Sequence, residues 1–193
     1  MKFTTVFIAF VLLLLTACTS NEPAENQSAS KTDTLQKKQA YVMDCSLLLN
    51  EAKRYDSTLL AQNELNDSLA RIAIKAFTGY ASYCHDASDA PIYLVKTASV
   101  AKAINNIPQA KLALETVVNN YPGFDNMPAA LFMLAQLYDE VSYLNDEHEA
   151  ARLYRKIIAD YPQTDWAPVA QAALQMIGKS DKEMLEIFKK KSK

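Results

Sequence analysis

Apolar residues recur every three or four positions through most of the chain after residue 33, and prolines or polar clusters interrupt them at intervals. This period is typical of amphipathic helices that bury one face. The fold class is therefore predicted to be all-α. The interruptions divide the sequence into eight predicted helices, at about residues 35–62, 69–84, 91–104, 107–121, 128–143, 147–161, 168–177 and 181–193.

The first two predicted helices are expected to form an antiparallel hairpin. The first carries one unbroken apolar seam that runs from residue 41 through Cys45 to Leu59. The polar stretch 63–68 ends it, and Asp67 or Ser68 is expected to cap the second helix by accepting a free amide. The expected buried face of the second helix consists of Leu69, Ile72, Ala73, Ala76, Phe77 and Tyr80.

Capping sequences and prolines mark where later helices begin. The spacing of a capping box occurs twice, in Asp146 with Glu149 and in Ser180 with Glu183. The last helix is expected to bury Met184, Leu185 and Phe188 and to close the stack. Proline fits the first helical turn, because its missing amide needs no partner there. The prolines at such places are Pro91, Pro108, Pro128 and Pro168.

A repeated segment indicates how the helices are organised. Residues 110–122 read AKLALETVVNNYP, and residues 150–162, forty positions later, read AARLYRKIIADYP. Small, large and paired apolar residues and a final Tyr-Pro fall at matching positions. A weaker copy covers residues 72–84, with Tyr83-Cys84 at the Tyr-Pro place. Periods of this length, built from paired helices, are typical of helical solenoids.

This spacing resembles that of tetratricopeptide repeats, and the resemblance covers Leu69 to about Phe188. It implies a right-handed solenoid of about four antiparallel hairpins. It also implies that the helices at 91–104, 128–143 and 168–177 line a concave groove that binds a protein segment. Core packing or plain solvation is the alternative for each candidate groove residue. The candidates are Tyr93, Lys96, Phe132, Gln136, Asp139, Tyr143, Gln171 and Gln175.

The amino terminus is interpreted as a lipoprotein signal peptide over residues 1–17. Its apolar run, residues 3–15, would span roughly 20 Å as a helix, which is short of the roughly 30 Å of a bilayer core. Leu15-Thr16-Ala17-Cys18 resembles a bacterial lipobox, which implies lipidation of Cys18 and stable anchoring by two or more chains. An ordinary secretory signal with a chance cysteine is the alternative.

The rest of the chain then divides into a tether and one domain. Residues 18–33 contain no large apolar side chain and are predicted to be a flexible tether. Residues 34–193 form the predicted repeat domain. Thr19 stands where Asp favours retention in the inner membrane of double-membraned bacteria. The expected location is therefore the outer membrane, facing the periplasm.

Cys45 and Cys84 are candidates for a disulfide, because the envelope outside the inner membrane is oxidising. In an antiparallel hairpin, paired residues have numbers with a constant sum. For a turn centred near Glu64 and Leu65 this sum is 129, and the residue numbers of Cys45 and Cys84 also add up to 129. A bridge requires α-carbons closer than packed helix axes normally allow. Two free thiols that fill the core are the alternative.

No motif in the sequence indicates catalysis, a cofactor or a metal. There are two histidines, and neither has a second ligand at metal-binding spacing. No glycine-rich phosphate loop or nucleophile motif occurs. The formal net charge of −2 argues against nucleic-acid binding, which needs a basic surface. The chain is predicted not to be an enzyme.

The whole arrangement resembles tetratricopeptide-repeat lipoproteins of the bacterial envelope. In architecture it is similar to the outer-membrane-protein assembly lipoprotein and to the repeat domain of the Tol-Pal coordinator. The chain is shorter than the first and lacks the coiled coil of the second, so neither specific role is carried over. The leading hypothesis is a membrane-anchored adaptor that binds proteins, with a part in outer-membrane biogenesis as one role.

Two other hypotheses remain open. One is a glycan- or nutrient-capture accessory lipoprotein, and the other is a structural spacer. Exposed groove aromatics on neighbouring turns would favour glycan capture, whereas a groove dominated by charge and amide would favour peptide binding.

Overall fold

The computed structural model describes residues 44–191 of the chain, and this part contains eight α-helices joined by turns. No strand occurs within this part. The predictions for residues 1–43, which include the signal peptide, Cys18 and the tether, lie outside it. The helices are α2 (Cys45–Leu60), α3 (Asp67–Tyr83), α4 (Ala90–Ala103), α5 (Ile107–Asn120), α6 (Met127–Asp139), α7 (Glu147–Asp160), α8 (Trp166–Met176) and α9 (Asp181–Lys191).

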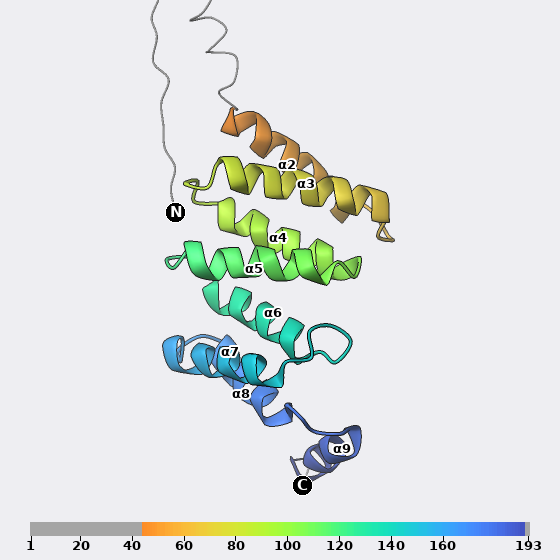
Figure 1. The fold of residues 1–193 in the computed structure, drawn as a ribbon, viewed down its shortest axis with the longest axis vertical. Coiled ribbons are helices and arrows are strands. Elements are labelled where there is room, and N and C mark those ends of the chain that lie inside the picture. Colours follow the sequence, from red (N-terminus) through yellow and green to blue (C-terminus); the bar gives the residue numbers. More distant parts are fainter. Residues whose placement is uncertain (1–43, 192–193) are drawn as a thin grey trace, which may run out of the picture. The chain divides into compact units, whose positions relative to one another are not determined.

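The helices form a solenoid of hairpins. Each helix from α2 to α7 packs against the next one, which gives the hairpins α2/α3, α4/α5 and α6/α7, followed by α8 (Figure 1). Helix α6 also contacts α8, so the first helices of successive hairpins meet. The predicted all-α helical solenoid is confirmed. None of the described helices is both long enough and apolar enough to cross a bilayer.

The three hairpin-to-hairpin turns have the same backbone hydrogen bonds, which confirms the repeat. The first residue after each second helix donates its amide to the carbonyl four positions earlier; these residues are Cys84, Tyr121 and Tyr161, at 2.9, 3.0 and 3.0 Å. Three positions later, Ala87, Phe124 and Thr164 donate to the carbonyls of those residues. Cys84 is therefore the structural equivalent of Tyr121. The predicted alignment placed Tyr83 at this position, so it was wrong by one residue.

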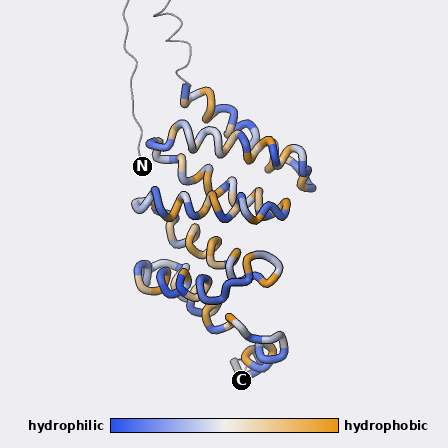
Figure 2. Tube along the Cα trace, in the orientation of Figure 1, coloured by the Kyte–Doolittle hydropathy of each residue, from blue (hydrophilic) through white to orange (hydrophobic). Residues whose placement is uncertain are grey.

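The main core is a cluster of apolar side chains from α3 to α8. Small residues such as Ala110, Ala130 and Ala150 are fully buried and let the helices approach closely. Leu131 and Ile157 are also fully buried and fill the space between them. Figure 2 shows that apolar residues run along most of α6, which packs against α5, α7 and α8.

A second, smaller cluster joins α2 to the rest of the solenoid. Phe77, Tyr80 and Tyr93 form its aromatic centre, with the ring of Tyr93 at 5.6 Å from that of Phe77 and 5.1 Å from that of Tyr80. From α2 only Ala52 is fully buried. Helix α2 therefore rests on much less buried apolar surface than α3, which has six buried residues.

The first hairpin differs from the prediction at both helix starts. Helix α2 begins at Cys45, because Asp44 is extended and its carboxylate accepts the Ser46 amide at 2.8 Å. The predicted unbroken helix is therefore wrong at Asp44. Helix α3 is capped by Asn66 instead of Asp67 or Ser68, and the Asn66 side chain accepts the Leu69 amide at 3.0 Å.

The buried face of α3 is also broader than predicted. This helix lies between α2 and α4, so it contributes to two clusters. Ile74 and Ala81 belong to the main core, and Ala73, Phe77 and Tyr80 to the smaller one. The prediction that Ile72 is buried is wrong, since 47% of it is exposed on the remaining face.

Helices α6 and α9 depart from the prediction as well. Helix α6 ends at Asp139, and Val141 and Tyr143 lie in the turn that follows. That turn is closed by backbone bonds back to α6, including one from the Asp146 amide to the Tyr138 carbonyl at 2.7 Å. Helix α9 makes only sparse contacts with the other described helices, and Leu185 is exposed instead of buried. The predicted fourth hairpin is therefore not closely packed. The predicted burial of Met184 and Phe188 lies outside the side chains that the structure describes.

The predicted capping boxes are present in different degrees. The Ser180 hydroxyl lies 3.5 Å from the Glu183 amide, and the Glu183 carboxylate accepts the Ser180 amide at 2.9 Å. Asp146 accepts the Glu149 amide at 3.0 Å. The Glu149 side chain binds Arg152 on the next turn, so only half of that box is formed.

Candidate functional site

Two adjoining hollows form a groove along α4, α6 and α8. The larger one has a volume of about 840 Å³ and is formed by α6, α7, α8 and the turn after α8. The smaller one, of about 210 Å³, lies between α4, α5 and α6. Lys102 of α4 and Gln136 of α6 line both. We call this continuous hollow the groove.

The floor of the groove is aromatic and is held rigidly by the core. The ring of Phe132 lies 5.4 Å from that of Tyr154 and 5.2 Å from that of Trp166, measured between centroids. Tyr154 is almost fully buried, and its hydroxyl donates to the carboxylate of Asp139 at 3.4 Å. Ala173 and Met176 complete the floor from α8.

The rim carries charges of both signs. Asp139, Glu140 and Glu147 line the larger hollow together with Lys102 and Lys179. An amide, a carboxylate and an ammonium can each bind a peptide backbone or a charged side chain. The rim is therefore suited to hydrogen bonding with a polar ligand above an apolar floor, which is the usual composition of a binding site.

Asp139 is a carboxylate of the groove whose pKa is raised by its surroundings. Partial burial raises the pKa of its carboxyl group, and the hydrogen bond from Tyr154 partly opposes this. The charges of Glu147 and Glu140 raise the Asp139 pKa further. The pKa of Tyr154 is itself raised, mainly by burial and then by Asp139. A cation that binds beside Asp139 would be favoured, because it would stabilise the ionised carboxylate.

The structure brings three of the candidate groove residues together. Phe132 lies in the floor of the larger hollow, and Gln136 and Asp139 line its side. Gln171 and Gln175 are exposed on α8 but do not line the hollow, because Ala173 and Met176 take the groove-facing positions of that helix.

The other three candidates lie elsewhere. Tyr93 is buried in the smaller core cluster. Lys96 binds Asp56 of α2, with 2.7 Å between Nζ and Oδ2. Both residues therefore join α4 to the first hairpin. Tyr143 is in the turn after α6, with its ring centroid 6.0 Å from the Lys102 ammonium.

Several groove residues were not predicted. Lys102 lies six positions after the predicted Lys96, roughly a third of a turn away from it around α4, so the helical period counted from Lys96 does not indicate it. Glu147 and Lys179 come from segments outside the predicted groove helices, and their approach depends on the turn after α8. Gly178 has a φ of +70° there, and a Cβ added to it would lie 2.9 Å from a Glu147 carboxylate oxygen. The sequence gives no indication of this contact.

Cys45 and Cys84 lie outside the groove. Their sulfur atoms are bonded in the structure, and their α-carbons are 5.8 Å apart. The bond joins the start of α2 to the end of α3. Among the described residues, no group of three potential ligands is placed to hold a metal ion.

Comparison with protein families identifies the hairpins that form most of the groove. Residues 93–123 and 129–164 match the family model described as tetratricopeptide repeat. Repeats of this family are generally non-catalytic modules that bind other proteins. A comparison with curated proteins finds no match. The first matched segment covers most of α4 and α5, and the second most of α6 and α7. These two hairpins therefore match tetratricopeptide repeats, and they form the centre of a tetratricopeptide-like helical solenoid.

Proposed function

We propose that the protein is a lipid-anchored adaptor of the bacterial envelope that binds an extended protein segment in the groove. The observation that carries the proposal is the continuous hollow along α4, α6 and α8, with an aromatic floor and a charged rim. A stacked array of hairpins offers a rigid, extended concave surface. The helices already hold the side chains in place, so little ordering of the protein opposes binding.

The composition of the groove favours a peptide over a glycan. Tyr93 is buried in the core, and only 9% of Phe132 is exposed. Aromatic faces are therefore not open on neighbouring turns. The accessible rim instead presents Lys102, Gln136 and Asp139. These groups are suited to backbone amides and charged side chains, which occur along every protein segment.

The anchoring part of the proposal rests on the sequence alone. Leu15-Thr16-Ala17-Cys18 supplies the lipobox, and Cys18 would carry the lipid. The tether of residues 18–33 would let the solenoid reach a partner away from the bilayer. Thr19 favours the outer membrane, and the solenoid would then face the periplasm. A part in outer-membrane biogenesis is the role that we favour for such an adaptor.

The groove is tested by site-specific photocrosslinking in intact cells. A photoreactive residue is placed at Gln136, with a matched control at Leu112, which is 58% exposed on α5 and does not line the groove. We expect discrete protein adducts from position 136 and none of the same size from position 112. Equal adducts at both positions would contradict groove binding. Retention of polysaccharide without protein adducts would favour the glycan alternative. Absence of both polysaccharide and protein adducts would favour the spacer.

The anchor is tested separately by Cys18→Ser. We expect the variant to leave the membrane fraction and remain in the soluble exported fraction, whereas Cys84→Ser, a control at a cysteine in the folded domain, stays with the membrane. Density separation of inner and outer membranes then tests the location. A Cys18→Ser protein that still sediments with membranes would contradict lipid anchoring and leave groove binding unaffected.

A further inference from the structure

A third hollow lies at the edge of the solenoid, between two of the repeated turns. Its volume is about 410 Å³, and it is formed by the turn between α3 and α4 and the turn between α5 and α6. It shares no lining residue with the groove. We call it the edge pocket. Its size is within the range of pockets that hold ligands in proteins.

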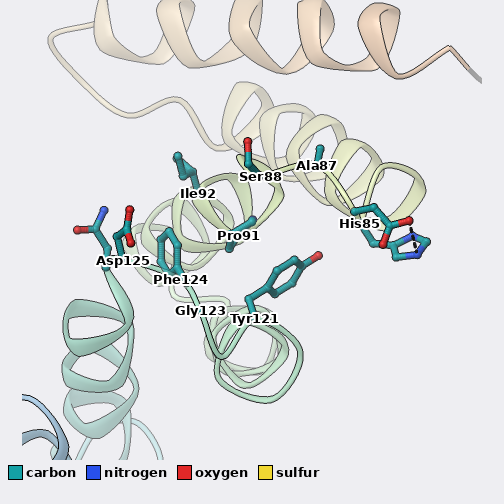
Figure 3. A pocket seen from close by; sticks show the side chains of 11 residues that line it. His85, Ala87, Ser88, Pro91, Ile92, Tyr121, Gly123, Phe124 and Asp125 are labelled. Atoms are coloured by element: carbon teal, nitrogen blue, oxygen red, sulfur yellow. Dashed lines mark ion pairs between the residues drawn. The ribbon is translucent and has the colours of Figure 1, made fainter.

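The edge pocket has an apolar centre and a carboxylate at each end. Figure 3 shows Asp125 and His85 at opposite ends, with Phe124, Pro91 and Tyr121 between them. His85 lies beside Asp86, with 3.5 Å between Nε2 and Oδ2. Ile92 is 40% exposed at the same place. Tyr121 and Phe124 are half-buried, so part of the apolar surface is open to a ligand.

The formally charged side chains that line the pocket are the carboxylates of Asp86 and Asp125. Asp86 is 95% exposed at its side chain, so its charge is available. Among the described residues that line the pocket, none is Lys or Arg. Helices α3 and α5 end here, and α4 and α6 begin here, so the partial charges of the helix ends have both signs and largely cancel. The carboxylates therefore set the sign of the local potential.

The aromatic residues add to the attraction for a cation. The face of a tyrosine or phenylalanine ring attracts ammonium and guanidinium groups. Tyr121 lies in the field of Asp86: its pKa is raised, first by burial and then by this charge. Lysine and arginine combine an apolar stem with a cationic head. Such a side chain would place its stem on the apolar centre and its head at a carboxylate.

We propose that the edge pocket binds a protein segment in which Arg or Lys side chains flank an apolar residue. The two carboxylates accept the two cations, and Phe124 and Tyr121 contact the apolar residue between them. The Ser88 and Asn126 side chains also line the pocket and can bind the backbone of the segment. This site is independent of the groove and does not rest on the function proposed for it.

Gly123 allows the pocket to be blocked without disturbing the fold. A Cβ added at Gly123 has no atom within 4 Å, so it fits without a clash, and because Gly123 lines the pocket we expect a larger side chain there to occupy part of the open space. Gly79, in the middle of α3, has equally open surroundings and lines no part of the edge pocket. Gly123→Leu and Gly79→Leu are therefore a matched pair, in which the same substitution fills the pocket or leaves it open.

The test measures peptide binding to the full-length chain in detergent by fluorescence anisotropy. The probe is a labelled peptide, Gly-Arg-Ala-Leu-Ala-Arg-Gly. Two control copies of this peptide are compared with it: one has Glu in place of both Arg residues, and the other has Ser in place of Leu. We expect saturable binding of the probe, at least tenfold weaker binding of both copies, and weakening at higher salt. Gly123→Leu should weaken binding at least tenfold, and Gly79→Leu less than twofold.

Asp86→Asn and Asp125→Asn provide a second route that removes charge without adding volume. Each should weaken probe binding about three- to tenfold, with unchanged circular dichroism and midpoint of thermal unfolding. No saturable binding of the probe up to about 1 mM, equal binding of the Glu copy, or indifference to Gly123→Leu would overturn the proposal. Spermine binding that is equally strong and equally sensitive to Gly123→Leu would also overturn it, in favour of a free polyamine.

Discussion

The bond between Cys45 and Cys84 should hold α2 on the solenoid, and breaking it should release that helix alone. Helix α2 has a single fully buried residue, Ala52, and its other apolar side chains are at most partly buried in the smaller cluster. The main core contains residues from α3 to α8 and none from α2. We therefore expect reduction to unfold α2 and leave the rest of the fold in place.

The size of the effect follows from the length of chain that the bond closes. The two cysteines are 39 residues apart, and the chain-entropy model gives about 4 kcal/mol for a loop of that length. If α3 stays folded, only the stretch 45–66 becomes free between its two ends, and the same model gives about 3.5 kcal/mol. A difference of 3–4 kcal/mol corresponds to two to three powers of ten in the opening equilibrium.

Hydrogen exchange measured by mass spectrometry, with and without a reductant, tests this expectation. Amides of α2 should exchange roughly a hundred- to a thousandfold faster after reduction, whereas amides of α5 should change by a small factor. Asp56→Asn in the oxidised protein serves as a control: it removes the ion pair with Lys96, which is worth about 1 kcal/mol or less at this exposure. Two free thiols in the non-reduced protein, or equal loss of protection in α2 and α5, would refute the reasoning.

Three further outcomes are expected from urea unfolding. Leu131→Ala, at a fully buried position, should cost about 2–5 kcal/mol, and a cost near zero would contradict the core assignment. Gly178→Ala should cost about 1–3 kcal/mol, because φ is +70° and the new Cβ meets Glu147; Glu147→Ala should recover only the contact part. The pKa of Asp139 is raised in the folded protein, which means that the folded state binds the proton of this carboxyl group more tightly than the unfolded state does. The contribution of Asp139 to the free energy of unfolding is therefore full below the pKa of the unfolded state, and it falls as the pH rises through the pKa of the folded state. Asp139→Asn should remove that fall, and an identical pH dependence in both proteins would contradict it.

Much of the solenoid could be predicted because the repeat is written in short-range patterns. The spacing of Ala150, Ile157 and Pro162 encodes a buried helical face and its end within about a dozen residues. The prolines of α4, α6 and α8 fix the start of each following helix through the missing amide. These effects act over one or two turns, so the sequence alone is enough to locate them.

The groove was only partly predictable, because its shape depends on contacts between distant segments. Phe132, Gln136 and Asp139 share one face of α6, and the helical period finds them. Tyr93 has a similar place on α4, but α3 and α2 supply an aromatic cluster that buries it. Which face of α4 is covered depends on how the first hairpin packs, and no local pattern contains that information.

The edge pocket illustrates why the departures from the repeat matter more for function than the repeat itself. The turns that begin at Tyr121 and Tyr161 have the same backbone hydrogen bonds, so the two backbones are held in the same way. Gly123 opens the first turn, whereas Gln163 occupies its place in the second, forty positions later. Cys84 likewise stands where the other two turns have tyrosine. A repeated scaffold places equivalent positions at regular intervals, and a residue that differs from its equivalents can then create a site without altering the scaffold.

If this reasoning is correct, Gly123→Gln, which restores the repeat, should abolish peptide binding at the edge pocket and leave the free energy of unfolding unchanged within about 0.5 kcal/mol.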